Sequence, residues 1–359
     1  MKRLAIIFFM LVFAIFGCKK AGNKSDQYES EFNESLIPVR FDKFFHLTKI
    51  NLESSPKSLV SFPYDITTLG SEIYISSRDV PIKVFDRTGK FLRTIGNIGD
   101  GPGEYRWVDC IFPIPPDKIG IYGFPSRSLS VFKSNGDFVG SKRLPFAPGR
   151  RVVVYYKNHY YIQVPYTPEY RCNVIELTDS FEVSGTYFPA QSGFEAYTGT
   201  GMFHGGLFVD TTDGCLYEMD SFSENVIRKL DLHSKKTSYI SLGKPSFFTP
   251  IPPLRRAPNY QEAQESFNKG TDVLNLYLLE SRFFVVHYII SEGPMRIIKS
   301  VVYDLKHHKS YLIEGGFGAT YCDGRHLYEL IFVEHNNEDL RHPVNPILII
   351  YDVNEEFRK

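Results

Sequence analysis

The chain is poor in the features that usually mark a nucleic-acid-binding, membrane-spanning or disulfide-stabilised protein. Its 359 residues include one Trp and five Cys, and its 41 basic and 41 acidic residues cancel. Balanced charge gives no overall field that would favour nucleic acid or an anionic membrane surface. The apolar run Leu4–Phe16 is shorter than the roughly 20 residues that a helix needs to cross a bilayer. We therefore expect no nucleic-acid partner and no membrane-spanning helix.

Recognised catalytic motifs are also missing from the sequence. The glycine-rich loop Gly96–Gly103 is followed by strand-like residues 108–114, whereas a dinucleotide site requires the N-terminus of a helix there. His204-Gly205-Gly206 resembles the oxyanion segment of some esterases, yet no G-x-S-x-G motif accompanies it. No HExxH motif or EF-hand loop is present. The sequence predicts no catalytic residue, no metal ligand and no cofactor. Motif spacing does not reveal a site that is assembled from residues far apart in the sequence.

The cysteines show no spacing typical of a metal site or a redox motif. Apart from Cys18, they stand alone at Cys110, Cys172, Cys215 and Cys322, and the first three lie within or beside strand-like segments. We expect them to be small apolar core residues without a disulfide.

The N-terminus has the pattern of a secretory leader. Two basic residues, the run Leu4–Phe16 and a small residue precede Cys18. The segment Ile15–Cys18 (IFGC) resembles the lipobox of bacterial lipoproteins, in which the cysteine becomes the lipidated first residue. The sequence thus predicts a signal peptide over 1–17 and a lipidated, mostly disordered tether over 18–40, since the latter is polar and charged. The alternative is a signal peptide cleaved elsewhere.

What the chain has in abundance is aromatic side chains in a repeated strand pattern. The 23 Tyr and 30 Phe suit strands, because aromatic residues pack well on pleated surfaces. The clearest unit runs from Ile73 to Tyr105, with alternating apolar residues, a turn at Thr88-Gly89 and a glycine-rich loop. Six segments share its hairpin followed by an apolar-Tyr-apolar strand or a close relative, beginning near residues 70, 117, 157, 213, 280 and 323. Six such units predict an all-β, six-bladed β-propeller of four-stranded antiparallel blades over 41–359.

The ends of the chain predict how the ring closes. Only eight residues follow Tyr351, too few for another useful strand, whereas the segment Phe44–Leu52 before the first unit reads as a spare strand. Pairing of this segment with residues 346–352 would complete the sixth blade and remove two exposed sheet edges. We expect an N-terminal strand to close the propeller.

One part of the chain resembles a known repeat. Asn97–Tyr105 (NIGDGPGEY), Leu129–Phe132 and Asn135–Phe138 are similar to the NHL-type repeat over residues 70–140. With the lipobox, the whole chain resembles the six-bladed β-propeller lipoproteins that are abundant in Bacteroides and its relatives. This resemblance implies the fold and an outer-membrane location but no catalytic residues. Because the segment after Cys18 lacks the acidic cluster associated with surface export in this group, we expect a periplasm-facing protein.

In a propeller the two ends of the ring differ, and here the connections differ in length. Tight turns fall at one end and long connections, including an insertion over 243–272, at the other. Within this insertion, Asn259 and Glu262 predict the start of a short helix with Tyr260, Ala263 and Phe267 on one apolar stripe. Long loops on a rigid scaffold are where binding groups gather. We expect a ligand or partner to contact Arg78, Arg106, Trp107, Arg127, Tyr166, Tyr170, Arg171 and His204.

These observations leave three functional hypotheses. The favoured one is a non-enzymatic envelope lipoprotein, lipidated at Cys18, that binds a carbohydrate, an anionic ligand or a protein partner through the long loops. A metal-assisted hydrolase or lyase acting on a sugar or lactone at the central channel is the alternative. A structural subunit of an envelope complex is the third.

Overall fold

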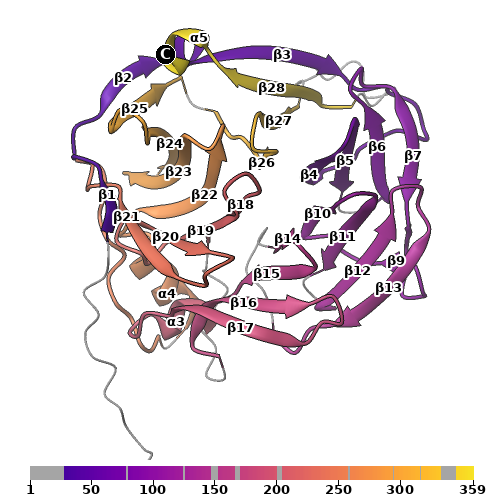
Figure 1. Cartoon of the computed structure of the whole chain (residues 1–359), viewed down its shortest axis with the longest axis horizontal. Coiled ribbons are helices and arrows are strands. Elements are labelled where there is room, and N and C mark those ends of the chain that lie inside the picture. The colour runs from indigo at the N-terminus through magenta and orange to yellow at the C-terminus, as the bar shows by residue number, and fades with distance from the viewer. Residues whose placement is uncertain are drawn as a thin grey trace, which may run out of the picture.

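The computed structural model shows an all-β ring of six blades around a central axis (Figure 1). It describes residues 28–77, 80–123, 126–146, 153–165, 170–199, 204–257, 259–293, 295–315, 317–332 and 345–359. Each blade is an antiparallel sheet whose first strand faces the axis and whose fourth lies at the periphery. The predicted fold class is therefore confirmed.

The first three blades are contiguous in the chain. Blade 1 contains β4 (Pro63–Leu69), β5 (Glu72–Ser77), β6 (Ile82–Asp86) and β7 (Phe91–Ile95). Blade 2 contains β10 (Cys110–Ile114), β11 (Lys118–Gly123), β12 (Ser128–Lys133) and β13 (Phe138–Arg143). Blade 3 contains β14 (Val153–Tyr156), β15 (His159–Gln163), β16 (Cys172–Thr178) and β17 (Val183–Pro189). Between blades 1 and 2, β8 (Asn97–Ile98) and β9 (Glu104–Tyr105) pair across the glycine-rich loop.

The last three blades recruit strands from the N-terminal segment. Blade 4 contains β18 (Gly205–Asp210), β19 (Cys215–Asp220), β20 (Val226–Asp231) and β21 (Thr237–Ser241), and β1 (Tyr28–Glu31) joins its outer edge. Blade 5 contains β22 (Asp272–Leu279), β23 (Phe283–Glu292), β24 (Met295–Asp304) and β25 (Lys309–Glu314), and β2 (Ile37–Arg40) joins its outer edge. Blade 6 contains β26 (Tyr321–Cys322), β27 (Leu327–Ile331), β28 (Ile347–Val353) and β3 (Phe45–Asn51).

Alternation of apolar side chains explains how neighbouring blades pack. Ile73, Tyr74 and Ile75 in β5 are all completely buried. Because successive side chains of a strand point to opposite faces, Ile73 and Ile75 pack into the core between blades 1 and 6, while Tyr74 packs into the core between blades 1 and 2. Each blade is thus apolar on both faces, which is why the ring is held together by inter-blade cores.

The predicted closure of the ring is confirmed. The strand β3 pairs antiparallel with β28 in a continuous register from Ile347 opposite Asn51 to Val353 opposite Phe45. Asn345 reinforces the junction, because its amide accepts a hydrogen bond from the Val60 backbone N–H at 2.6 Å and donates one to the Glu53 carbonyl at 2.7 Å. The first and last segments of the propeller therefore form one blade.

The N-terminal segment contributes more structure than the sequence indicated. The strands β1 and β2 pair in parallel with β21 and β25, the outermost strands of blades 4 and 5. Among the described residues, strand pairing is therefore already present at Tyr28, ahead of residue 41, where the sequence placed the start of the propeller. Phe32 is 2% exposed and lies in the core of blades 4 and 5, and the partly buried Leu36 packs against the same core. The polar composition around it concealed these strands, and residues 1–27, with Cys18, lie outside the described part of the chain.

Two short helices decorate the connections flanking blade 4. The helix α4 (Tyr260–Phe267) begins as predicted at Asn259, whose side chain accepts a hydrogen bond from the Glu262 backbone N–H at 2.9 Å. Ala263 and Phe267 are buried against α3 (Glu195–Gly199). The predicted apolar stripe is wrong at its first member, because Tyr260 is 56% exposed. At the chain ends, α2 (Phe41–Phe44) and α5 (Glu355–Arg358) pack together through Phe44 and Phe357.

The cysteines after Cys18 behave as predicted. All four are free thiols buried in the inter-blade cores. Burial raises the pKa of the Cys172 thiol to about 11 and that of Cys215 to about 12. Such thiols are inert core groups rather than nucleophiles.

His287, in the middle of β23, is fully buried and gives the stability of the protein a defined pH dependence. Its Nδ1 lies 2.8 Å from the Ser300 hydroxyl, and its ring meets Phe317 and Tyr277 edge to face. Burial lowers the pKa of His287 to about 4. The folded protein therefore keeps this imidazole neutral at a pH where the unfolded chain, with an ordinary histidine pKa of about 6.5, is protonated.

We expect His287 to cost the folded state about 3 kcal/mol as the pH falls from about 6.5 to about 4, because the unfolded chain takes up a proton that the folded chain does not. Above about pH 6.5 both states hold the ring neutral, and the effect vanishes. Urea unfolding of the native chain and His287→Leu at about pH 7 and about pH 4 measures it. The free energy of unfolding should fall on acidification by about 3 kcal/mol less in His287→Leu than in the native chain. An equal loss in both proteins would refute the assignment.

Candidate functional site

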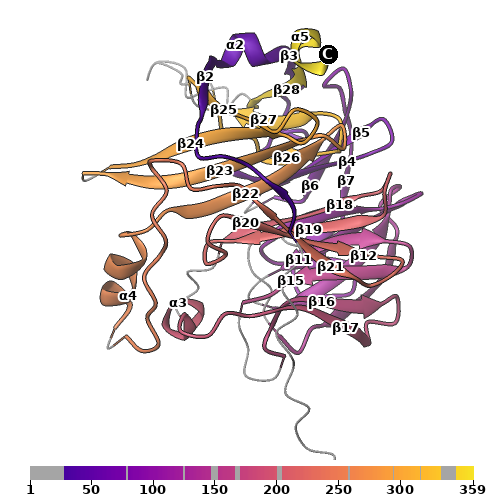
Figure 2. The same ribbon diagram turned by 60° about the vertical axis from the view of Figure 1, so that its left-hand side comes forward.

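The two ends of the ring present different surfaces. The turns joining first to second and third to fourth strands lie at one end, which we call the turn face, and the remaining connections lie at the other, which we call the loop face. Figure 2 shows the β23–β24 hairpin and α4 projecting on the same side of the ring, the loop face. The Ser291 hydroxyl donates a hydrogen bond to the Asn268 carbonyl at 3.0 Å and ties the two together.

Six of the eight predicted binding residues are described, and all six belong to the loop face. Trp107, Arg127 and Arg171 share an unusual backbone, with φ of 60°, 51° and 46°. This left-handed conformation is unfavourable for residues other than glycine and costs of order 1 kcal/mol or more at each position. The two arginines are exposed, and Trp107 is 39% exposed. The prediction for Arg78 and Tyr166 falls outside the described residues.

Two further predicted residues are engaged with neighbours from their own connections. Arg106 pairs with Asp100 at 2.6 Å, and both side chains are about 70% exposed, so the pair adds little stability. Tyr170 packs edge to face against Phe146 with ring centroids 5.7 Å apart. These contacts stabilise the connections in which the two residues lie.

The sixth, His204, has a partner that sequence spacing could not show. Its Nδ1 lies 2.8 Å from Oδ2 of Asp272, which is completely buried at the start of β22. The Ser221 hydroxyl donates to the other carboxylate oxygen at 2.6 Å, and Arg296 lies 3.2 Å from Oδ2. Burial opposes ionisation of Asp272, but the hydrogen bonds from His204 and Ser221 outweigh it and lower its pKa. Because Ser221 bonds to the carboxylate and not to the imidazole, this is not a serine–histidine–aspartate triad.

A buried charged cluster lies between blades 3 and 4. Arg228 donates to both Glu218 oxygens, at 2.5 Å and 2.9 Å, and also to Asp220. The amides of Gln163 and Asn173, from blade 3, donate to Glu218 and Asp220. Every charged member is at most 7% exposed. This cluster holds two blades together and is closed to a ligand.

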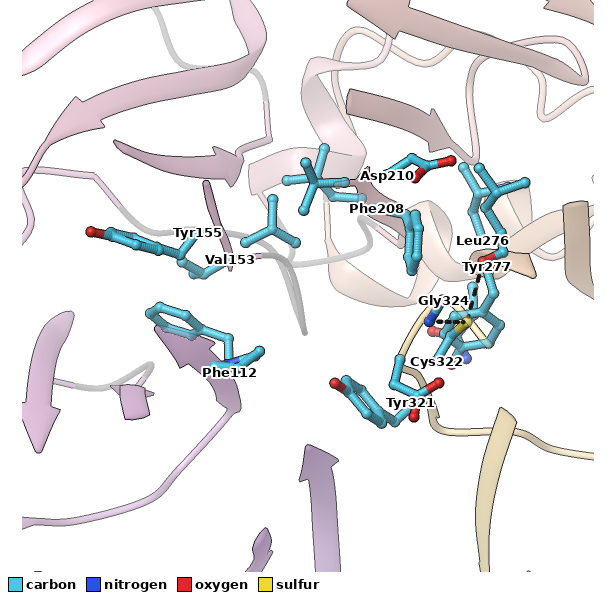
Figure 3. A pocket seen from close by; sticks show the side chains of 18 of the residues that line it. Phe112, Val153, Tyr155, Phe208, Asp210, Leu276, Tyr277, Tyr321, Cys322 and Gly324 are labelled. Atoms are coloured by element: carbon cyan, nitrogen blue, oxygen red, sulfur yellow. Dashed lines mark hydrogen bonds between the residues drawn. The ribbon is translucent and has the colours of Figure 1, made fainter. Parts of the chain in front are cut away.

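The feature that the sequence did not reveal is a cavity of about 320 Å³ in the central channel (Figure 3). It is walled by the first strands of blades 1 to 6, from Cys110, Val153 and Gly205 towards the loop face to Thr212 and Gly324 at the turn face. Thr212, Ser281 and Gly324 also border a shallow hollow on the turn face. The cavity therefore reaches the surface among the tight turns. None of the six described residues predicted from the long loops lines it.

Aromatic rings from five blades line much of this cavity, and hydrogen bonds fix several of them. The five are Phe112, Tyr155, Phe208, Tyr277 and Tyr321. The Tyr277 hydroxyl donates to the Ala319 carbonyl at 2.9 Å, and that of Tyr155 donates to Asp179 at 3.1 Å. The pKa of the Tyr155 hydroxyl is raised to about 12, mainly by burial. The walls are thus formed before any ligand arrives.

Three aspartates supply the charged groups of the cavity wall. Asp65 accepts a hydrogen bond from the Ile111 backbone N–H at 2.9 Å. Asp323 accepts from the Tyr328 hydroxyl at 2.6 Å and from the His326 backbone N–H at 2.7 Å. Burial opposes its ionisation, but bonds to His326 and Tyr328 prevail and lower its pKa. Asp210 accepts from the Thr212 backbone N–H at 2.8 Å through Oδ1. Its Oδ2 is buried and has no hydrogen-bond donor among the described residues.

Within the described part of the chain, no group of three or more His, Cys, Asp or Glu side chains is placed to hold a metal ion. The metal-assisted hydrolase hypothesis therefore lacks a ligand set among these residues. No described helix is both long enough and apolar enough to cross a membrane.

Comparison with known proteins places the chain in a family. No curated protein matches it. The crystal structure of a Bacteroides fragilis protein described as exported is similar, with a TM-score of 0.64 and 15% identity, over 90% of this chain and 99% of the other. A member of the DUF4221 family from Bacteroides vulgatus has a TM-score of 0.58 and 12% identity, over 87% and 98%. At such identities the similarity shows the fold alone. The family model described as "Domain of unknown function (DUF4934)" matches residues 33–322, and the chain therefore belongs to this family.

Proposed function

We propose that this protein is an envelope lipoprotein, lipidated at Cys18, that binds a small molecule in the channel of its propeller. The observation that carries the proposal is the cavity of about 320 Å³. Small-molecule sites are concave, mostly apolar, largely preformed, and supplied with a few polar groups. The channel has each of these properties, and its walls are strands of a rigid ring rather than loops.

The same observation favours binding over catalysis. The polar groups of the cavity are carboxylates, hydroxyls and the Asn275 amide, and its two thiols, of Cys110 and Cys322, are buried. Burial strongly raises the pKa of the Cys322 thiol, so it is not an activated nucleophile. Among the described residues of the lining, no imidazole or amine is present to serve as a general base near neutral pH.

Blocking the mouth of the cavity tests this proposal. Thr212 is exposed in the β18–β19 turn and lines both the cavity and the hollow outside it. We expect Thr212→Trp to abolish binding of small aromatic molecules detected by saturation-transfer NMR, without changing the unfolding temperature. Thr237→Trp, at an exposed threonine in the outer strand β21, is the matched control and should bind normally. Equal binding by both variants would place the ligand site elsewhere.

A second function, docking of a protein partner on the loop face, is favoured by the left-handed backbone of Trp107, Arg127 and Arg171. Strain of this kind concentrates at functional sites, and exposed Trp and Arg are frequent anchors of interfaces. Capture of a partner from envelope extracts by the native chain, but not by Arg127→Ala/Arg171→Ala, would support it. Unchanged capture would remove this face from consideration. A fixed partner that copurifies in the absence of any small ligand would instead favour a structural subunit.

The location in the envelope is tested separately from binding. A lipid on Cys18 would hold the chain at the outer membrane, and we propose that it faces the periplasm. Metabolic labelling with a fatty acid should mark the native chain and not Cys18→Ser. Protease added to intact cells should leave it uncut, and cleavage would indicate the outer leaflet.

A further inference from the structure

We infer that the ligand of the channel is a small organic cation, an amine or quaternary ammonium group carried on an apolar body. The inference rests on the proposed function, because it names the class of molecule that the cavity takes. Its basis is the charge of the lining, which includes Asp65, Asp210 and Asp323 but no Lys, Arg or His among the described residues. A cavity with charged groups of one sign favours a ligand of the opposite sign.

Asp210 is the group that most needs a ligand. It ends β18, is 5% exposed, and keeps Oδ1 occupied by the Thr212 backbone N–H at 2.8 Å. Oδ2 is buried and finds no donor among the described residues. A buried acceptor left without a donor is energetically unfavourable. Because Oδ2 is closed to direct contact, an ammonium group in the cavity would be stabilised by the negative charge of Asp210 rather than by a hydrogen bond to this oxygen.

The carboxylates of Asp65 and Asp323 also contribute negative charge to the cavity, and both already accept hydrogen bonds from the protein. Hydrogen bonds from Tyr328 and His326 lower the pKa of Asp323 and hold it ionised, and Asp65 accepts a hydrogen bond from the Ile111 N–H. Basic residues do occur close by, because Arg325 and Arg358 border the hollow outside the cavity. Arg358 is paired with Glu280 at 2.6 Å. These positive groups lie at the entrance on the turn face, whereas the lining itself remains acidic.

The rings of the lining favour an organic cation over a metal ion. Phe112, Tyr155, Phe208, Tyr277 and Tyr321 come from different sides of the cavity. The face of an aromatic ring attracts an ammonium group within about 6 Å, and the apolar body of such a ligand would bury against the same rings. A hard metal ion would need several oxygen ligands gathered at one point, and the described residues show no such group. This differs from the anionic or carbohydrate ligand expected for the loop face, because the arginines of that face do not line the cavity.

Three probes of similar size and different charge test the inference on the mature chain. They are benzyltrimethylammonium, benzyl alcohol and benzoate, with affinities measured by NMR titration. We expect the cation to bind at least about tenfold more tightly than the alcohol, as a charge-assisted contact provides, and benzoate not to bind. Asp210→Asn, which keeps the shape of the side chain, should weaken the cation about tenfold and leave the alcohol unchanged. Asp117→Asn is the matched control, because Asp117 is exposed on the turn face and does not line the cavity. This substitution should change the affinity of neither the cation nor the alcohol.

Each other outcome has a defined meaning. Equal binding of the cation and the alcohol, both lost in Thr212→Trp, would keep the channel as a binding site and overturn the choice of a cation. Tight binding of benzoate would overturn that choice as well. Cation binding that survives both Asp210→Asn and Thr212→Trp would place the cation outside the channel and refute the inference. If none of the three probes binds, both the inference and the proposed function fail.

Discussion

Replacing Arg228 with methionine should lower the free energy of unfolding by about 3 to 5 kcal/mol, because the substitution leaves two buried carboxylates without their counter-charge. Glu218 is fully buried and Asp220 is 3% exposed, and the guanidinium bonds to both. Burial raises the pKa of Glu218 to about 7, although Arg228 opposes this shift. Without Arg228 the Glu218 carboxyl would be still harder to ionise. The loss of stability should therefore be larger at alkaline than at acidic pH, where protonation relieves it.

Two further variants separate loss of the counter-charge from loss of packing. Arg228→Met/Glu218→Gln removes one of the stranded carboxylates and should recover part of the stability at alkaline pH. Lys229→Met, at the next residue of β20, removes the outer ion pair with Glu29 and a cation–π contact with Tyr217 and should cost less than about 1 kcal/mol. Urea unfolding gives all three values. If Arg228→Met proved as mild as Lys229→Met, the buried cluster would not hold blades 3 and 4 together.

Removal of β3 should have the second large effect, namely loss of the cooperatively folded ring. A chain that starts at residue 53 lacks the outer strand of blade 6 and leaves β28 with an exposed edge, which favours aggregation. It also exposes Leu348 and Ile350, which are at most 8% exposed in the intact chain. We expect this chain to show no single unfolding transition and to associate.

Two shorter truncations serve as controls for this effect. A chain that starts at Tyr28 keeps every described strand and should match the native protein. A chain that starts at Phe41 loses β1 and β2, together with the buried Phe32, but keeps β3. Because β1 and β2 only extend already complete blades, this chain should fold with reduced stability. Scanning calorimetry distinguishes the three. Cooperative unfolding of the chain that starts at residue 53 would contradict closure by β3.

The parts of the fold that could be predicted depend on local patterns. Alternating residues such as those of β5, and turns such as Thr88-Gly89, specify each hairpin within a few residues of sequence. The spare segment before the first unit and the short end after Tyr351 specified closure by β3. The strands β1 and β2 could not be predicted, because residues 28–40 are mostly polar. They are held by pairing with the fourth strands of blades 4 and 5 and by one buried ring, Phe32.

The candidate site was less predictable, because it is assembled from the whole ring. The cavity combines residues from six first strands, such as Phe112, Phe208 and Tyr321, and each of them looks like an ordinary core residue in its own strand. The pairing of His204 with Asp272 likewise joins residues 68 positions apart. The long connections predicted a site on the loop face, whereas the cavity reaches the surface between the tight turns of the turn face. Strand periodicity would identify the first strands but could not show how their side chains leave space between them.

Methyl NMR with the cationic probe tests the central claim, that the channel is the binding site, most directly. The methyl groups of Val153, Leu207 and Leu276 line the cavity, while those of Leu92, Val139 and Val183 are at least 40% exposed on outer strands. Titration with benzyltrimethylammonium should shift the first three signals in a saturable manner and leave the other three unchanged. Saturable shifts confined to the exposed methyl groups, with the cavity signals unmoved, would contradict the account.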